Sequence, residues 1–176
     1  MANGIPSYLQ GKHNIVDDSF SYGTGLNIGN FCIIEEDVVV GSNVKISDYV
    51  KIPKGSRIGD NCTIGSYVRL GKRCRLGNAV VVKCHAVVSP DVVVEDYAFI
   101  GPNAILLHQT PDGKHRPCRI GKEVFIGTGV YVNPGVVIEE GIVIGSGSVV
   151  SKTLKVKGVY LGSPARLTKI PLVKNG

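Results

Sequence analysis

Residues 58–81 read IGDNCTIGSYVRLGKRCRLGNAVV and divide into four consecutive units of six residues. Each unit begins with Ile or Leu followed by Gly, and its fifth residue is Cys or Val. Neither the 3.6-residue period of a helix nor the two-residue alternation of a simple strand produces this pattern. A six-residue period therefore predicts a repeat architecture, with one short strand and one bend in each unit.

The same phase extends in both directions from this stretch. Units follow one another without a break over residues 16–105, and they resume over residues 120–155. The first position is aliphatic throughout, except at Tyr22. We expect positions one and five to point inward and positions three and four to form a corner. Gly, common at position two, is expected to adopt the strained backbone angles. Three units then make one triangular coil, and stacked coils pair as parallel strands.

The repeat resembles that of the hexapeptide-repeat acyltransferases, and the resemblance covers about residues 16–160. It implies an all-β fold, a left-handed parallel β-helix of about seven triangular coils. One protruding loop, at about residues 107–119, interrupts the helix, and a short tail follows it. We accordingly expect an N-terminal lead-in of residues 1–15, a catalytic β-helix domain of residues 16–160 and a C-terminal tail of residues 161–176.

The composition excludes several classes of protein. The chain starts without the apolar segment of a signal peptide and has no apolar run long enough to span a membrane, so we expect a cytoplasmic protein without a membrane partner. The net charge of +6 fits a polyanion or a phosphorylated cofactor. Aromatic residues are sparse, and no basic helix or zinc-finger spacing is present, which argues against nucleic acid as a partner.

The five cysteines show no paired spacing, which argues against a disulfide framework and against a zinc site. Four of them, Cys32, Cys62, Cys74 and Cys118, occupy position five of their units and are expected to pack in the core. Cys84 instead occupies position three, on a corner.

Position six points outward, and its chemistry changes along the chain. In the early coils it is often basic, at Lys45, Lys51, Arg57, Arg69 and Arg75. In the later coils it is apolar, at Val81, Val87, Val93, Phe99, Ile105, Phe125, Tyr131, Val137, Val143 and Val149. A monomer in water should not expose so many apolar side chains, so the later coils are expected to pack against other subunits. The resemblance implies a homotrimer, with active sites between neighbouring subunits.

The end of the chain carries a second signature. Residues 126–152, IGTGVYVNPGVVIEEGIVIGSGSVVSK, and residues 162–169, GSPARLTK, closely resemble the last coils of the family's CoA-dependent acetyltransferases. There, backbone amides and small corner side chains line a groove for the pantetheine arm. The resemblance assigns this cofactor-binding role to Thr128 and Ser146, and contacts with the CoA phosphates to Lys152 and Arg166, with Ser151 beside them. Acetyl-CoA is thus the expected cosubstrate, and no metal is expected.

Acetyl transfer from a thioester requires a nucleophile, a base that removes its proton, and donors that hold the oxyanion. Histidine is the usual base, and the chain offers His13, His85, His108 and His115. His13 precedes the first unit and is expected at the surface. His108, at the mouth of the loop, is the leading candidate, followed by His85 on a corner and then by His115. A reaction without a protein base, in which the departing thiolate accepts the proton, stays open.

Two further residues are expected to contact the substrate. Cys84 occupies the corner position at which some sugar acetyltransferases of this fold carry their base, so the match is displaced by one residue from His85. Asn103 follows the Gly-Pro pair at about the place where relatives that act on nucleotide-linked amino sugars carry a polar residue, often Asn.

These features favour an acetyl-CoA-dependent N-acetyltransferase that acts on an amino sugar, expected to be dTDP- or UDP-linked, in surface polysaccharide biosynthesis. The amine would attack the thioester directly. The loop lacks the GHP tripeptide of maltose-type enzymes, and the repeats begin close to the start of the chain. A sugar or antibiotic O-acetyltransferase is the alternative. A γ-type carbonic anhydrase is less favoured, because the closest pair of histidines in this region is seven residues apart rather than five. A purely structural protein is a further alternative.

Overall fold

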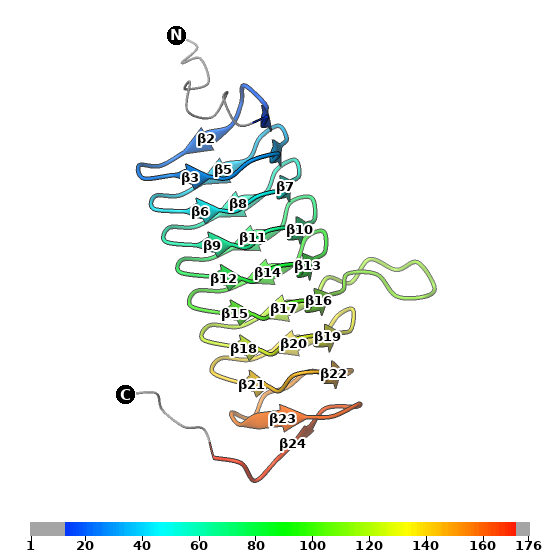
Figure 1. The fold of residues 1–176 in the computed structure, drawn as a ribbon. Helices are drawn as coiled ribbons and strands as arrows, with labels where there is room; N and C mark the ends of the chain where they lie inside the picture. Colours follow the sequence, from blue (N-terminus) through cyan, green and yellow to red (C-terminus); the bar gives the residue numbers. More distant parts are fainter. Residues whose placement is uncertain (1–12, 172–176) are drawn as a thin grey trace.

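A computed structural model describes residues 13–171 as a tall stack of short parallel strands wound into a three-sided β-helix (Figure 1). Within these residues no helix is present. The architecture confirms the predicted all-β parallel β-helix and is consistent with a left-handed coil. None of the described segments is a helix long and apolar enough to cross a membrane.

The three sides of the prism are three sheets. The eight-stranded sheet contains β1 (Ile15–Val16), β4 (Ile33–Ile34), β7 (Lys51–Ile52), β10 (Arg69–Leu70), β13 (Val87–Val88), β16 (Ile105–Leu106), β19 (Tyr131–Val132) and β22 (Val149–Val150). The seven-stranded sheet contains β2 (Ser21–Tyr22), β5 (Val39–Val40), β8 (Arg57–Ile58), β11 (Arg75–Leu76), β14 (Val93–Val94), β17 (Arg119–Ile120) and β20 (Val137–Ile138). The nine-stranded sheet contains β3 (Asn27–Ile28), β6 (Lys45–Ile46), β9 (Thr63–Ile64), β12 (Val81–Val82), β15 (Phe99–Ile100), β18 (Phe125–Ile126), β21 (Val143–Ile144), β23 (Val159–Leu161) and β24 (Arg166–Leu167).

The prism has about eight turns, so the expectation of about seven coils was slightly low. Each strand joins position six of one unit to position one of the next, as in the register Val81↔Phe99 and Val82↔Ile100. The interrupted unit that starts at Leu106 therefore still contributes the strand β16. At the other end, β23 continues the nine-stranded sheet, and β24 folds back on it as an antiparallel partner.

The core follows the predicted positions. Residues at positions one and five are buried in almost every unit, for example Ile64 and Val68, and positions three and four form the turns. The four cysteines at position five are buried as expected, and Cys84 is exposed on its corner. Burial raises the pKa of Cys62 and Cys74 to about 11 and that of Cys118 to about 12, so these thiols stay protonated and act as packing groups.

The role predicted for glycine at position two was wrong. The positive φ angles occur at position four instead, for example 58° at Tyr49 and 60° at Tyr67. Position two needs glycine because the next coil lies directly against it: a Cβ on Gly65 would be 2.7 Å from the backbone nitrogen of Cys84. Position two therefore sets the spacing between coils, whereas position four turns the chain.

Two corners matter for function. The loop corner joins the eight-stranded to the seven-stranded sheet and includes residues 71–74, 89–92 and 107–118. The aromatic corner joins the nine-stranded to the eight-stranded sheet and includes residues 65–68, 83–86, 101–104, 127–130 and 145–148. The expected lead-in lies almost wholly outside the described residues, and the domain boundaries stay predictions.

Candidate functional site

The loop of residues 107–118 projects from the loop corner between β16 and β17 (Figure 1). Its two arms are joined at the root, where the Arg116 amide donates to the His108 carbonyl at 2.6 Å and the Cys118 amide donates to the Leu107 carbonyl at 3.2 Å. The buried Cys118 returns the chain to the core. These contacts confirm the predicted excursion and its return at Cys118.

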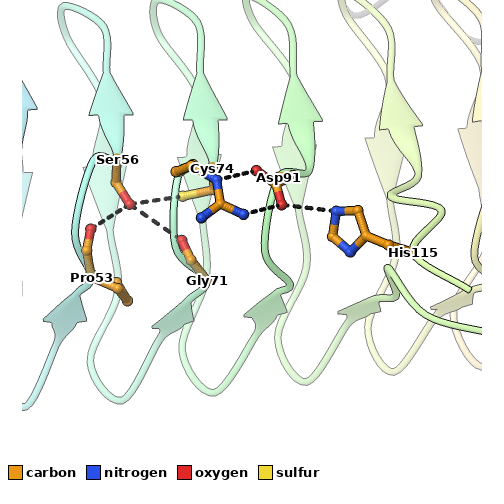
Figure 2. A network of polar contacts seen from close by, with 7 residues as sticks. Pro53, Ser56, Gly71, Cys74, Asp91 and His115 are labelled. Atoms are coloured by element: carbon orange, nitrogen blue, oxygen red, sulfur yellow. Dashed lines mark hydrogen bonds and ion pairs between the residues drawn. The ribbon is translucent and has the colours of Figure 1, made fainter. Parts of the chain in front are cut away.

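The loop brings two histidines together at its root. The ring centroids of His108 and His115 are 5.4 Å apart, and the rings meet edge to face. Nε2 of His115 lies 2.8 Å from Oδ2 of Asp91, which belongs to the coil that precedes the loop (Figure 2). A histidine that donates from Nε2 to a carboxylate leaves its Nδ1 free to accept a proton.

Asp91 is held in place by a second cation. Nε and one terminal nitrogen of Arg73 donate to its two carboxylate oxygens, both at 2.7 Å. The two residues occupy position four of stacked coils, so their side chains lie one above the other. Hydrogen bonding to Arg73 is the main cause that lowers the pKa of Asp91, and His115 adds to it. The carboxylate is therefore ionised at neutral pH and can orient His115.

His108 is half-buried between the corner and the loop. Its pKa is lowered, chiefly by burial and then by the positive charge that His115 can carry, while Asp91 opposes the shift. A histidine with a lowered pKa is neutral at pH 7, and the neutral form is the one that can accept a proton. The structure thus combines a neutral histidine with a second histidine oriented by a carboxylate.

A buried polar cluster lies beneath this part of the corner (Figure 2). The Ser56 hydroxyl lies within hydrogen-bond distance of the carbonyls of Pro53 and Gly71, at 2.7 and 3.2 Å. The Cys74 thiol donates to the Ser56 oxygen at 3.6 Å. Because the hydroxyl has partners in its own coil and in the following one, the cluster fixes the corner that carries Arg73.

The other predicted base, His85, lies on the aromatic corner and not beside His108. Its ring stacks on Tyr67, with centroids 5.0 Å apart, at the end of a column of stacked rings. The column is formed by His13, Phe31, Tyr49, Tyr67 and His85. His13 is exposed, as expected. The two leading candidates for the base therefore lie on different corners of one chain.

The aromatic corner changes shape in the coils that follow His85. Asn103 is the last residue with a side chain at position four, and the next two coils have Gly129 and Gly147 there. A Cβ placed on either glycine would meet nothing within 4 Å, so the corner becomes an open shelf. Thr128 and Ser146 line this shelf, and the Thr128 amide donates to the Ser146 hydroxyl at 3.2 Å. The predicted stacking of these two residues is confirmed, and their role in binding CoA stays a prediction.

The predicted phosphate contacts are divided between two places. The Ala165 amide donates to the Val149 carbonyl at 2.8 Å, which places Arg166 at the C-terminal end of the aromatic corner. Ser151 and Lys152 follow β22 on the other side of that strand and are exposed. Arg166 is therefore in line with the shelf, whereas Ser151 and Lys152 lie beyond the opposite end of β22, across the eight-stranded sheet from it.

Asp91 and Arg73 were missed by sequence reasoning. The available signal was their spacing: opposite charges at position four of adjacent coils must stack, and the loop follows in the next coil. His115 was considered but ranked below His85, because it lies further out in the loop and the GHP tripeptide is absent. Its contact with Asp91 depends on how the loop folds back. Within residues 13–171 no group of three or more His, Cys, Asp or Glu side chains is arranged to hold a metal ion.

Comparisons with known proteins agree with the repeat architecture. Residues 37–72 and 117–152 match the family model described as bacterial transferase hexapeptide (six repeats). No curated protein matches the chain significantly.

Several solved structures are similar to this chain. A UDP-N-acetylglucosamine acyltransferase from Campylobacter jejuni has a TM-score of 0.62 at 17% identity, over 88% of this chain and 72% of that one. A mutant GDP-perosamine N-acetyl transferase from Caulobacter crescentus, in complex with CoA and GDP-perosamine, has a TM-score of 0.55 at 19% identity, over 89% of this chain and 57% of that one. The acetyltransferase domain of PglB from Neisseria gonorrhoeae has a TM-score of 0.47 at 19% identity, over 88% of this chain and 57% of that one.

The chain thus spans less than three fifths of two of these three structures. At such low identity the two structures with TM-scores above 0.5 show a shared fold and nothing more, while the family model identifies the repeat within residues 37–72 and 117–152. Residues 37–72 and 117–152 match the hexapeptide repeat of bacterial transferases, and this match confirms the resemblance on which the fold was predicted.

Proposed function

We propose that the protein is a cytoplasmic, homotrimeric N-acetyltransferase that transfers acetyl from acetyl-CoA to a nucleotide-linked amino sugar in surface polysaccharide biosynthesis. The observation that carries the proposal is the cluster of His108, His115 and Asp91 at the root of the loop. A regular β-helix has flat sides, and this loop is where the chain departs from regularity to place titratable groups together. The matched transferase repeat supports the same reaction class.

In this reaction the amine nitrogen attacks the thioester carbonyl, the carbon–sulfur bond breaks, and the amine loses a proton. His108 is the proposed base, because its lowered pKa keeps it neutral and its ring lies at the loop root. The proton that it accepts can pass to the departing thiolate, so the enzyme returns to its starting state. His115, oriented by Asp91, positions His108 and modulates its pKa.

The shelf on the aromatic corner fits the arm of CoA. Gly129 and Gly147 leave open space at position four, and a larger side chain there would fill it. Thr128 and Ser146 offer small polar groups along the shelf, and Arg166 lies at the C-terminal end of the shelf. A solved protein of the same fold that is an N-acetyl transferase in complex with CoA supports this assignment. The roles of Lys152, Ser151, His85, Cys84 and Asn103 stay predictions.

The outward apolar residues support a trimer. On the eight-stranded sheet Val87, Ile105, Tyr131 and Val149 are paired in register and form one apolar column. On the nine-stranded sheet Val81, Phe99, Phe125 and Val143 form another. These are two different apolar faces, and each must be shielded from water by another subunit. Such a pair favours head-to-tail contacts, in which one face of a subunit packs on the other face of the next, and these contacts close into a ring.

A neighbour packed on the eight-stranded sheet would be within reach of both of its edges. One edge is the loop corner with His108, and the other is the aromatic corner with the shelf. Within one chain these two parts of the proposed site are separated by the width of that sheet. A second copy is therefore needed to combine a base from one subunit with a CoA groove from the next.

O-acetylation of a sugar is the second candidate function. A carboxylate that orients a histidine, as Asp91 orients His115, strengthens a base. A sugar hydroxyl needs such a base more than an amine does, because a neutral amine attacks through its lone pair, whereas a neutral hydroxyl is a weak nucleophile until a base removes its proton.

A single screen tests the proposal. The purified protein is incubated with acetyl-CoA and a panel of amino sugars, free and linked to UDP, dTDP or GDP, and with their hydroxyl counterparts, while thiol release is followed. We expect thiol release with a nucleotide-linked amine. Release with hydroxyl sugars alone would make the protein an O-acetyltransferase, and no release with any acceptor would contradict acetyl transfer.

A further inference from the structure

A basic groove of about 370 Å³ runs along the eight-stranded sheet beside the loop corner. Lys51 of β7, Arg69 of β10 and Lys72 line one part of it, and His108 lies at its end nearest the loop. Val87 and Pro90 complete the wall between these two parts. The groove therefore connects a group of cations with the histidine proposed as the base.

The cations in the groove are not all neutralised. Lys51 pairs with Glu35, with its nitrogen 2.7 Å from the carboxylate. Arg69 and Lys72 form no ion pair among residues 13–171, and both are exposed. One carboxylate thus faces three cations, which leaves a net positive site. A guanidinium fork and an ammonium group together suit the oxygens of a phosphate.

The groove also lies where the outward face of the eight-stranded sheet changes from basic to apolar side chains. Outward residues of this sheet change from Lys51 and Arg69 to Val87 and Ile105 in successive coils. If a neighbouring subunit covers the apolar column of the eight-stranded sheet, the basic coils on the N-terminal side of the covered region stay open. A substrate could then enter along the cations and place its far end beside His108.

We propose that this groove binds the diphosphate of a nucleotide-linked amino sugar, with Arg69 and Lys72 at the phosphates and the sugar directed toward His108. The inference rests on the proposed function and names the part of the site that selects its substrate. CoA also contains a diphosphate. The groove is assigned to the sugar nucleotide because it opens at the loop corner, whereas the glycine shelf lies on the aromatic corner.

The test compares two arginines in one coil. Arg69→Ala removes a groove cation, and Arg75→Ala removes the residue at the same position of the next unit, on the seven-stranded sheet. Both variants lose one charge at an exposed site, so the protein's overall field changes equally. Dissociation constants for UDP, dTDP, GDP, inorganic pyrophosphate and CoA are measured by calorimetry on the wild type and on both variants.

We expect Arg69→Ala to weaken binding of at least one nucleoside diphosphate by about 10-fold or more, with CoA affinity unchanged. Arg75→Ala should leave both affinities unchanged. Equal effects of the two variants, absence of nucleoside diphosphate binding, or a loss confined to CoA would each overturn the inference. Pyrophosphate carries the same diphosphate, so Arg69→Ala should weaken its binding too, and a loss of nucleoside diphosphate affinity without any loss of pyrophosphate affinity would overturn the placement of Arg69 at the phosphates.

Thiol-release assays separate this inference from the proposed function. If the protein acetylates free amino sugars but Arg69→Ala changes no nucleoside diphosphate affinity, the groove assignment fails and acetyl transfer stands. If nucleoside diphosphates bind through Arg69 but acetyl-CoA is never consumed, the groove stands and the proposed reaction fails.

Discussion

Replacing Gly65 by Ala tests the claim that position-two glycines set the spacing between coils. The new Cβ would lie 2.7 Å from the Cys84 nitrogen and 3.0 Å from the Lys83 carbonyl carbon, whereas ordinary contact begins at 3.4 Å. The next coil would thus have to move by several tenths of an ångström. It is held by backbone bonds, including Gly65 N to Val82 O at 2.8 Å, so the ladder must stretch.

Overpacking of this kind costs about 1–3 kcal/mol. For a domain of this size, that corresponds to a fall of roughly 2–12 °C in Tm. Thermal and urea unfolding followed by circular dichroism measure the change. The matched control is Gly129→Asn. The φ angle of Gly129 is +64° and no atom lies within 4 Å of the added Cβ. Asn103 adopts a similar φ angle at the same position of the preceding coil. The control should lose no more than about 0.5 kcal/mol. The reasoning fails if Gly65→Ala is as stable as the wild type, or if the control is the more damaged variant.

Three further predictions concern the site and the assembly. His108→Ala should lower kcat about 10²- to 10⁴-fold in steady-state assays and leave the KM for acetyl-CoA unchanged; an unchanged kcat would exclude His108 as the base. His115→Gln removes a positive neighbour that lowers the pKa of His108, so that pKa should rise and the acid limb of the kcat/KM profile should move to higher pH; a limb that stays or moves down would contradict the coupling. Phe125→Glu places a charge in an apolar column where Phe125 stacks on Phe99 at 4.7 Å, so light scattering should show smaller assemblies of folded protein, and an intact trimer would refute the proposed interface.

The repeat could be predicted in detail because each unit obeys local rules. An aliphatic residue at position one and a small one at position five must face a narrow core, so burial followed directly from the phase. The burial of Cys118 could be predicted across the interruption for the same reason. The role of the position-two glycines could not be predicted in this way, because the steric clash that they avoid is with the backbone of a coil eighteen or more residues away in the sequence.

The candidate site was predictable in part. The loop was located because it breaks the phase, and His108 was selected because it lies where the loop begins. The pairing of Asp91 with His115 depends on the path of the loop, for which the repeat provides no template. His85 ranked just below His108 in sequence, but the three-sided coil places the two histidines on different corners, and the His85 ring is part of a stacked column.

The central claim is acetyl transfer from acetyl-CoA to the amine of a nucleotide-linked sugar, with His108 as the base. The most direct test measures kcat/KM for one nucleotide-linked amino sugar and for its analogue with hydroxyl in place of the amine, on the wild type and on His108→Ala, with the product identified by mass spectrometry. We predict an N-acetylated product, a strong preference for the amine, and loss of that activity in His108→Ala. An acetylated hydroxyl analogue formed as fast as the amide, or no acetylated product from either acceptor, would contradict the claim.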